Sequence, residues 1–183
     1  MTTEDELRRM TIGEPRRHDA PITLAEYDPA WPLLYAREAE KVRTALGDRV
    51  VLLEHTGSTS VPGLAAKPII DMTLAVADTT AEGDYVPPLE AAGYVLRIRE
   101  PDWYEHRMLK GTDPDVNLHV FGTGCEEIGR MLRFRDRLRS SPEDRDLYLA
   151  RKRELATRTW RYTQDYADAK SAVVAEILGR AGG

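Results

Sequence analysis

The spacing of apolar residues changes from helical to strand-like near residue 50 and back to helical near residue 124. Before the first change, Asp28-Pro29 is typical of a helix start, because aspartate caps free N–H groups and proline suits the first helical position. Apolar side chains then recur at near-helical spacing from Trp31 to Leu46. The pattern predicts a helix over residues 29–46.

Short apolar runs between these two points predict a sheet. Strands are expected at residues 50–54, 69–76 and 94–99, and a short helix is expected from Pro87 to Gly93. Residues 103–109 and 116–121 flank a turn-rich segment, which predicts an antiparallel hairpin. We expect the strands near 50–54, 69–76 and 116–121 to be neighbours.

Helical spacing continues from Gly124 to the end of the chain. Ser141 starts one helix with an acid three residues later, and a last helix is expected over about 164–178. The order predicts an α+β or mixed α/β fold, with helices on one face of the sheet and a helical C-terminal segment. We expect a flexible leader over 1–21 and one domain over 22–183, with its sheet core over about 22–122 and its helical part over about 123–180.

Composition narrows the class of protein. The chain has 183 residues, with 26 basic and 31 acidic side chains and a formal net charge of −5, which argues against a dedicated binder of duplex nucleic acid. Cys125 is the only cysteine, so no disulfide framework is expected. No apolar run is long enough for a membrane span, and the polar N-terminus does not resemble a secretory signal. These features predict a cytoplasmic protein without membrane contact.

The segment from Glu54 to Asp71 carries the most chemical information. Gly57 lets a backbone come close to a ligand, and the hydroxyls of Ser58, Thr59 and Ser60 could hold phosphate oxygens. Asp71 could hold a divalent metal that bridges those phosphates, and Lys67 could neutralise their charge. The alternative is an ordinary strand–turn–strand connection with a capped structural aspartate.

The same segment, EHTGSTSVPGLAAKPIIDMTLAV, resembles the signature of the GrpB-like family, a branch of the nucleotidyltransferase superfamily. Four further segments agree in the right order. They are Tyr27 to Pro32 (the family's YDPxWP), Leu118-His119-Val120, the FRDRLR element of residues 134–139, and Tyr166 to Lys170. The resemblance covers about residues 22–178 and implies a nucleotidyltransferase-like mixed sheet.

The resemblance also implies a metal-dependent chemistry. Active members of the superfamily have a Gly-Ser turn and three carboxylates that hold two metal ions, Mg²⁺ or Mn²⁺. Gly57-Ser58 matches the turn and Asp71 the first acid, whereas Thr73 stands in the place of the second acid. His119 lies near the place of the third acid, and Asn117 replaces the first histidine of the family's HxH pair. Asp71 and His119 are therefore the expected metal ligands, in a site weaker than three carboxylates.

Histidines and basic residues complete the candidate set. His55, His119 and Asp71 could form an acid–base or metal cluster near one strand end, or the histidines could be hydrogen-bonded core residues. Arg135 lies in an arginine-rich helical segment that could face phosphate or solvent. Lys152 follows Tyr148 and Lys170 follows Tyr166 by one helical turn, and each pair could offer a ring and an ammonium to a nucleotide or be a packed ring beside a solvated lysine.

Three functions fit this sequence. The first is an enzyme that binds a nucleoside triphosphate and a divalent metal and transfers a nucleotidyl group to an unknown acceptor. The second is a degenerate member that serves as a nucleotide- or phosphate-binding module. The third is an enzyme that uses His55, His119 and Asp71 on a phosphorylated metabolite. Pyrophosphate release separates the first from the second.

Overall fold

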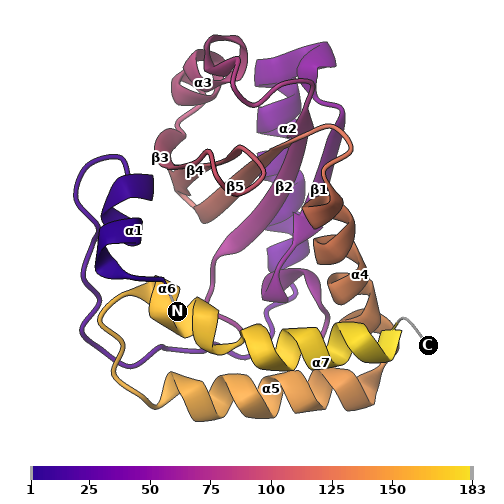
Figure 1. The fold of residues 1–183 in the computed structure, drawn as a ribbon. Helices are drawn as coiled ribbons and strands as arrows, with labels where there is room; N and C mark the ends of the chain where they lie inside the picture. The colour runs from indigo at the N-terminus through magenta and orange to yellow at the C-terminus, as the bar shows by residue number, and fades with distance from the viewer. Residues whose placement is uncertain (1, 182–183) are drawn as a thin grey trace.

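The computed structural model describes residues 2–181, so residue 1 and residues 182–183 of the expected leader and domain lie outside it. Its centre is a five-stranded mixed sheet with the order β1-β2-β5-β4-β3 (Figure 1). The strands are β1 (Leu52–Thr56), β2 (Ile70–Val76), β3 (Val95–Glu100), β4 (His106–Thr112) and β5 (Asp115–Gly122). Only β2 and β5 run parallel; the other neighbours are antiparallel. The expected adjacency of these three strands (β1, β2, β5) is confirmed.

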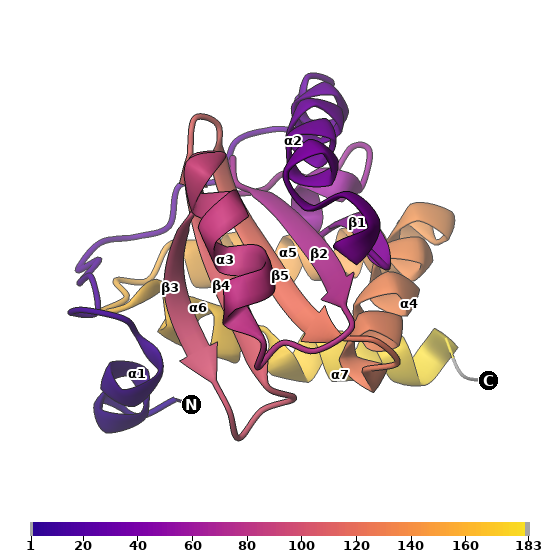
Figure 2. The same cartoon turned by 90° about the horizontal axis from the view of Figure 1, so that it is seen from above.

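One face of the sheet carries the main apolar core. Alternate residues of β2 and β5, among them Met72, Leu74, Leu118 and Val120, point to this face and are fully buried. Two helices cover it, α2 (Trp31–Leu46) and α3 (Glu82–Ala91), as seen from above in Figure 2. Elements that follow the last strand cover the opposite face, here called the second face. Near the start of β2, the residues that point toward this second face are largely polar.

The C-terminal half is helical, as expected. Helices α4 (Glu126–Ser140), α5 (Pro142–Ala156), α6 (Thr163–Ala169) and α7 (Ser171–Ala181) follow the last strand. The upper part of α4 covers Ala75 and Phe121 on the second face of the sheet, while α5 and α7 lie side by side beyond the start of β2 (Figure 1). The second face at the start of β2 is therefore turned toward the C-terminal helices, and we call the region around Asp71, Lys67, Lys152 and Lys170 the recess.

The expected mixed α/β class is confirmed, strand bounds shift by up to three residues, and two helices differ more clearly from expectation. The helix expected from Pro87 begins earlier, at Glu82, because two prolines are accommodated inside α3 rather than at its start. The helix expected over 164–178 is two helices that meet at Lys170. In the leader, α1 (Glu4–Met10) is helical, and the Ile12 N–H donates to the Arg97 carbonyl of β3.

Candidate functional site

Asp71 occupies the recess at the start of β2. In the sheet register it lies between Thr56 of β1 and Asn117 of β5, and Thr73 lies beside His119 two residues further along. These side chains share one face because residues two apart on a strand point the same way. Asn117 Nδ2 donates to Asp71 Oδ1 at 2.9 Å, and His119 Nε2 is 3.8 Å from the same oxygen. The expected grouping of Asp71 with His119 is therefore present.

Gly57 lies against the Asp71 carboxylate. Its φ of +67° and ψ of −174° belong to a region that is nearly restricted to glycine. A Cβ at this position would overlap the carboxylate and come within 2.9 Å of Asp71 Cγ. Because Gly57 has no side chain, the Asp71 carboxylate can lie directly beside the Gly57 backbone.

Three lysines from separate segments converge on this carboxylate. Lys67 follows the turn, Lys152 lies on α5 and Lys170 lies at the junction of α6 and α7. Each has Asp71 among the charges that act on it. The Lys152 ammonium donates to the Ala65 carbonyl at 2.6 Å. Within residues 2–181, ion pairs of lysine involve only Lys41 and Lys110.

The surroundings weaken the protonated forms of these lysines. Burial lowers the pKa of Lys170 to about 8, and burial together with neighbouring ammonium groups lowers the pKa values of Lys67 and Lys152. Burial alone would raise the pKa of Asp71, but interaction with His119, Asn117 and Lys67 holds that pKa below its usual range. One carboxylate therefore lies among three lysines whose charged forms are disfavoured by burial, and an additional anion would favour those charged forms.

The hydroxyls of the turn are placed differently from one another. Ser60 Oγ donates to the Gly57 carbonyl at 2.6 Å, and Thr59 Oγ1 donates to the Ile69 carbonyl at 3.2 Å. Both therefore stabilise the turn itself. Ser58 is half-buried and lies beside Tyr148, the tyrosine one helical turn before Lys152, and burial raises the pKa of Tyr148 to about 12. Ser58 is the turn hydroxyl directed to the recess side.

Thr73 is covered rather than open to the recess. It is fully buried, its hydroxyl lies 2.9 Å from that of Thr56, and it contacts the sulfur of Met131 on α4. Thr73 lies two residues after Asp71 on the same face of β2, which is the position expected for a second carboxylate. Helix α4 packs over this position. A divalent ion would accordingly find one carboxylate, Asp71, with His119 beside it.

A single hard cation fits this donor set only if a ligand supplies further oxygens. Among residues 2–181 there is no group of three or more histidine, cysteine, aspartate or glutamate side chains placed to hold a metal. Mg²⁺ commonly uses one or two carboxylates together with substrate phosphates. Asp71 meets that requirement for one ion, and two ions do not fit.

His55 does not join this group. It pairs with Met72 in the register and therefore points to the face opposite Asp71. Its ring stacks on Tyr35 of α2 at 4.6 Å between centroids, and its Nε2 lies 3.0 Å from Thr59 Oγ1. Burial lowers its pKa to about 4, so its ring is neutral near pH 7. The three-residue cluster with His119 is not formed.

His119 instead continues to a second histidine. His106 Nε2 lies 3.1 Å from His119 Nδ1, and His106 Nδ1 lies 2.6 Å from the carboxylate of Glu100. Trp103 and Phe121 pack around His106. Both histidines lie on the arms of the predicted hairpin, whereas Glu100 is brought opposite His106 by the pairing of β3 with β4, which was not predicted from the sequence.

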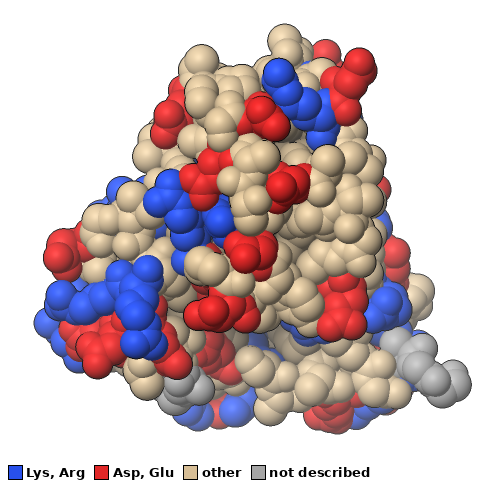
Figure 3. Space-filling view, turned by 45° about the horizontal axis from the view of Figure 1, so that its top comes forward, with Lys and Arg blue, Asp and Glu red and all other residues tan. Residues whose placement is uncertain are grey.

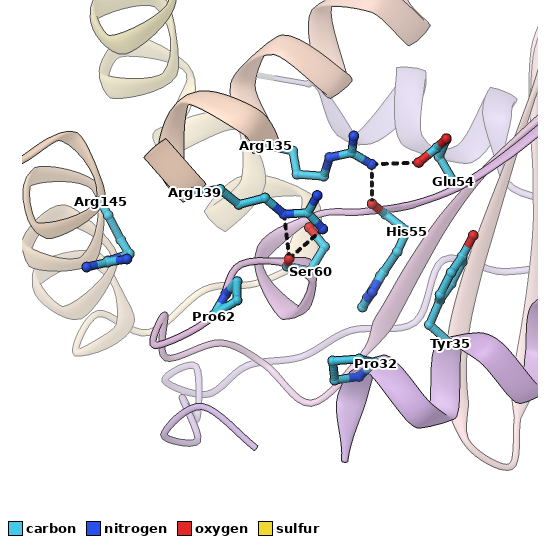
Figure 4. A pocket seen from close by; sticks show the side chains of 9 residues that line it. All are labelled: Pro32, Tyr35, Glu54, His55, Ser60, Pro62, Arg135, Arg139 and Arg145. Atoms are coloured by element: carbon cyan, nitrogen blue, oxygen red, sulfur yellow. Dashed lines mark hydrogen bonds and ion pairs between the residues drawn. The ribbon is translucent and has the colours of Figure 1, made fainter. Parts of the chain in front are cut away.

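Arg135 lies at the outer edge of β1 rather than beside Asp71. Its guanidinium donates to Glu54 at 2.8 Å and to the His55 carbonyl at 3.0 Å. It lines a cavity of about 430 Å³ with two further arginines from α4 and α5 (Figure 4). The expected phosphate contact of Arg135 with the Asp71 recess has no geometric support, because its guanidinium is engaged by Glu54, Asp136 and the His55 carbonyl.

Charge is mixed over the rest of the surface. Acidic and basic side chains intermingle on the face shown in Figure 3, and no single sign covers it. None of the helices within residues 2–181 is long and apolar enough to cross a membrane. Concentrated positive charge is thus a local property of the recess and of the arginine-lined cavity.

Comparison with known proteins shows the family of the chain. The GrpB protein family model matches residues 21–180. The chain belongs to the GrpB family. A UPF0157 protein of Halalkalibacterium halodurans is 59% identical over 98% of this chain and 92% of that protein. A dephospho-CoA kinase of Mycolicibacterium paratuberculosis is 33% identical over 76% of this chain but only 40% of its own length.

Solved structures show the same relationship. GrpB from Enterococcus faecalis has 30% sequence identity and a TM-score of 0.72, covering 87% of this chain and 96% of that chain. The Cid1 poly(U) polymerase is a more distant neighbour, with 11% identity and a TM-score of 0.46 over 62% of this chain and 41% of that chain. The five-stranded sheet and its helices are therefore the GrpB fold.

Proposed function

We propose that this GrpB protein binds a nucleoside triphosphate in the Asp71 recess and transfers its nucleotidyl group to a hydroxyl acceptor. The observation that carries the proposal is a cluster of lysines close enough to Asp71 to interact with its charge: Lys67 and Lys170 lie 5.8 and 4.5 Å from the centroid of the same Tyr166 ring, and Lys152 is buried. Three desolvated ammonium groups beside one anion are costly unless further negative charge enters. A triphosphate supplies that negative charge, and its three linked phosphates are long enough to contact lysines from three segments.

The other recess residues take distinct roles in this proposal. The exposed Gly57 backbone and the Ser58 hydroxyl would lie beside the phosphates, and a side chain at residue 57 would overlap the Asp71 carboxylate that holds the metal. Asp71, oriented by Asn117, would hold one Mg²⁺ or Mn²⁺ ion together with the phosphates. The ion would neutralise part of the negative charge of the phosphates. His119, 3.8 Å from Asp71, is placed to exchange a proton with the acceptor hydroxyl.

A second candidate is a nucleotide-binding module without turnover. The covered position of Thr73 favours it, since this hydroxyl is engaged by Thr56 and no second carboxylate reaches the metal. Binding through the lysines is common to both candidates. They differ in whether bound triphosphate is converted to pyrophosphate and a transferred nucleotidyl group.

Calorimetric titration of the four ribonucleoside triphosphates, with and without Mg²⁺, tests the shared step. Triphosphate binding that is weakened by Lys170→Met but unchanged by Arg151→Met supports binding in the recess. Arg151 lies on α5 and pairs with Glu154, so Arg151→Met is the control for loss of a basic side chain outside the recess. A pyrophosphate-release assay then separates enzyme from module. Dephospho-CoA belongs among the acceptors tested, because a relative bearing the name dephospho-CoA kinase contains a similar segment. Absence of binding to all four triphosphates would overturn both candidates.

A further inference from the structure

The arginine-lined cavity at the edge of β1 is separate from the Asp71 recess. It has a volume of about 430 Å³, within the range of small-molecule sites. Its walls come from α2, β1, the turn after Gly57, α4 and α5, and none of the three recess lysines lines it. The proposed function leaves this cavity unused.

Positive charge in the cavity exceeds its internal partners. Arg135 is satisfied by Glu54, Asp136 and a backbone carbonyl. Arg139 donates twice to the Ser60 carbonyl, at 3.0 and 2.8 Å, and its ion-pair partner Asp136 is 3.6 Å away and shared with Arg135. Arg145, on α5, forms no side-chain hydrogen bond or ion pair with the rest of residues 2–181.

The opposite wall is flat and uncharged. Tyr35 and His55 are stacked with an interplanar angle of 8°, and Figure 4 shows them across the cavity from Arg145. Because burial lowers the pKa of His55 to about 4, its ring adds no charge near pH 7. Glu54 also lines the cavity, but Arg135 holds its carboxylate at 2.8 Å.

We propose that this cavity binds a phosphorylated small molecule, with its phosphate between Arg139 and Arg145 and its organic portion against the Tyr35–His55 wall. Planar guanidinium groups match phosphate oxygens in geometry and charge. The cavity is larger than a phosphate alone, so the organic portion is part of the fit. This site does not depend on nucleotide binding in the recess.

Phenyl phosphate is a suitable probe because it combines a phosphate with a small ring. Titration is followed by the Nε–H signals of arginine in NMR spectra and by calorimetry. The expected result is a shift of the Arg139 and Arg145 signals and a loss of affinity of about tenfold or more in Arg145→Ala. Arg151→Ala, on the same helix and outside the cavity, is the matched control and should bind as wild type.

Two comparisons decide the outcome. Inorganic phosphate should bind more weakly than phenyl phosphate, and Lys170→Met should leave phenyl phosphate binding unchanged. Phenyl phosphate binding that survives Arg145→Ala in a variant with a native melting temperature would overturn the proposal. Loss of phenyl phosphate binding in Lys170→Met would also overturn it, because the probe would then occupy the recess. Triphosphate binding in Lys170→Met tests only the recess, and phenyl phosphate binding in Arg145→Ala tests only the cavity. The proposed function and this inference can therefore fail independently.

Discussion

Gly57 and Asp71 are in backbone-to-carboxylate contact, and a methyl group on Gly57 would come within 2.9 Å of Asp71 Cγ. The contact joins the turn after β1 to the start of β2, two segments that also pair in the sheet. It makes the position of the carboxylate depend on the absence of a side chain fourteen residues earlier. The first prediction follows from this dependence.

Gly57→Ala should displace the Asp71 carboxylate and abolish measurable triphosphate binding. It should also cost about 1–3 kcal/mol of stability, because alanine strains a backbone with positive φ. Gly63→Ala is the matched control: its φ is +78°, but a Cβ there meets nothing within 4 Å. Gly63→Ala should destabilise without loss of binding. Equal binding by the two variants would show that the Gly57 contact has no functional consequence.

Lys170→Met should weaken triphosphate binding by about tenfold or more while leaving the melting temperature unchanged or slightly higher. The ammonium contributes attraction to the ligand, but its burial opposes the charged form, as its lowered pKa of about 8 reflects. Methionine keeps the length and removes the charge. Calorimetry and thermal melting measure the two effects. A large fall in melting temperature would instead identify Lys170 as a structural residue.

The affinity for triphosphate should fall as pH rises through about 8. Lys170 has its pKa lowered to that value in the unliganded protein, so it loses its proton above it and attracts phosphate less. Binding at pH 7 and pH 9 is measured at constant ionic strength. The same change in pH should have a smaller effect on Lys170→Met, and equal pH profiles would exclude Lys170 as the titrating group.

Asp71→Asn should have opposite effects with and without a divalent ion. Removing the carboxylate charge eliminates the attraction for Mg²⁺ and should weaken Mg²⁺-dependent binding by about tenfold or more. Without the ion, the same change removes repulsion between Asp71 and the phosphates, so metal-free triphosphate should bind more tightly. Calorimetry in Mg²⁺ and in chelator measures both. A uniform effect in the two conditions would contradict a role in metal binding.

Stability should decrease as pH falls from about 6.5 to about 4 because of His55. Its pKa is lowered to about 4 in the folded protein, so the unfolded chain binds a proton in this interval that the folded chain does not. The contribution is about 2–3 kcal/mol, from roughly 1.4 kcal/mol per pKa unit. Denaturant unfolding of wild type and His55→Gln across this interval measures it. The variant should show a shallower decline, and parallel curves would refute the assignment.

The elements with strong periodicity could be predicted from sequence. The α2 helix and the β2 strand lie within two residues of their expected bounds, because each buries one regular set of apolar side chains. The division of the last helix at Lys170 could not be predicted, since the apolar spacing continues across the break. Its position matters because the break places Lys170 over Tyr166 and in the recess.

The candidate site could be predicted where strand pairing decided it. Asp71, Asn117 and His119 share a face because parallel strands keep alternation in step. Sequence spacing could not tell which way His55 points, since one residue of register reverses the face. Nor could it place Tyr148, whose approach to Ser58 depends on how α5 docks.

The convergence of the lysines also has a consequence for synthesis of the chain. Asp71 belongs to the middle of the sequence, whereas Lys152 and Lys170 come from its last helices. A ribosome-bound chain that has completed its sheet still lacks two of the three recess cations. The proposed ligand would therefore stabilise the finished protein but would not guide folding of the sheet before the last helices are made, which must rely on the apolar core of the sheet.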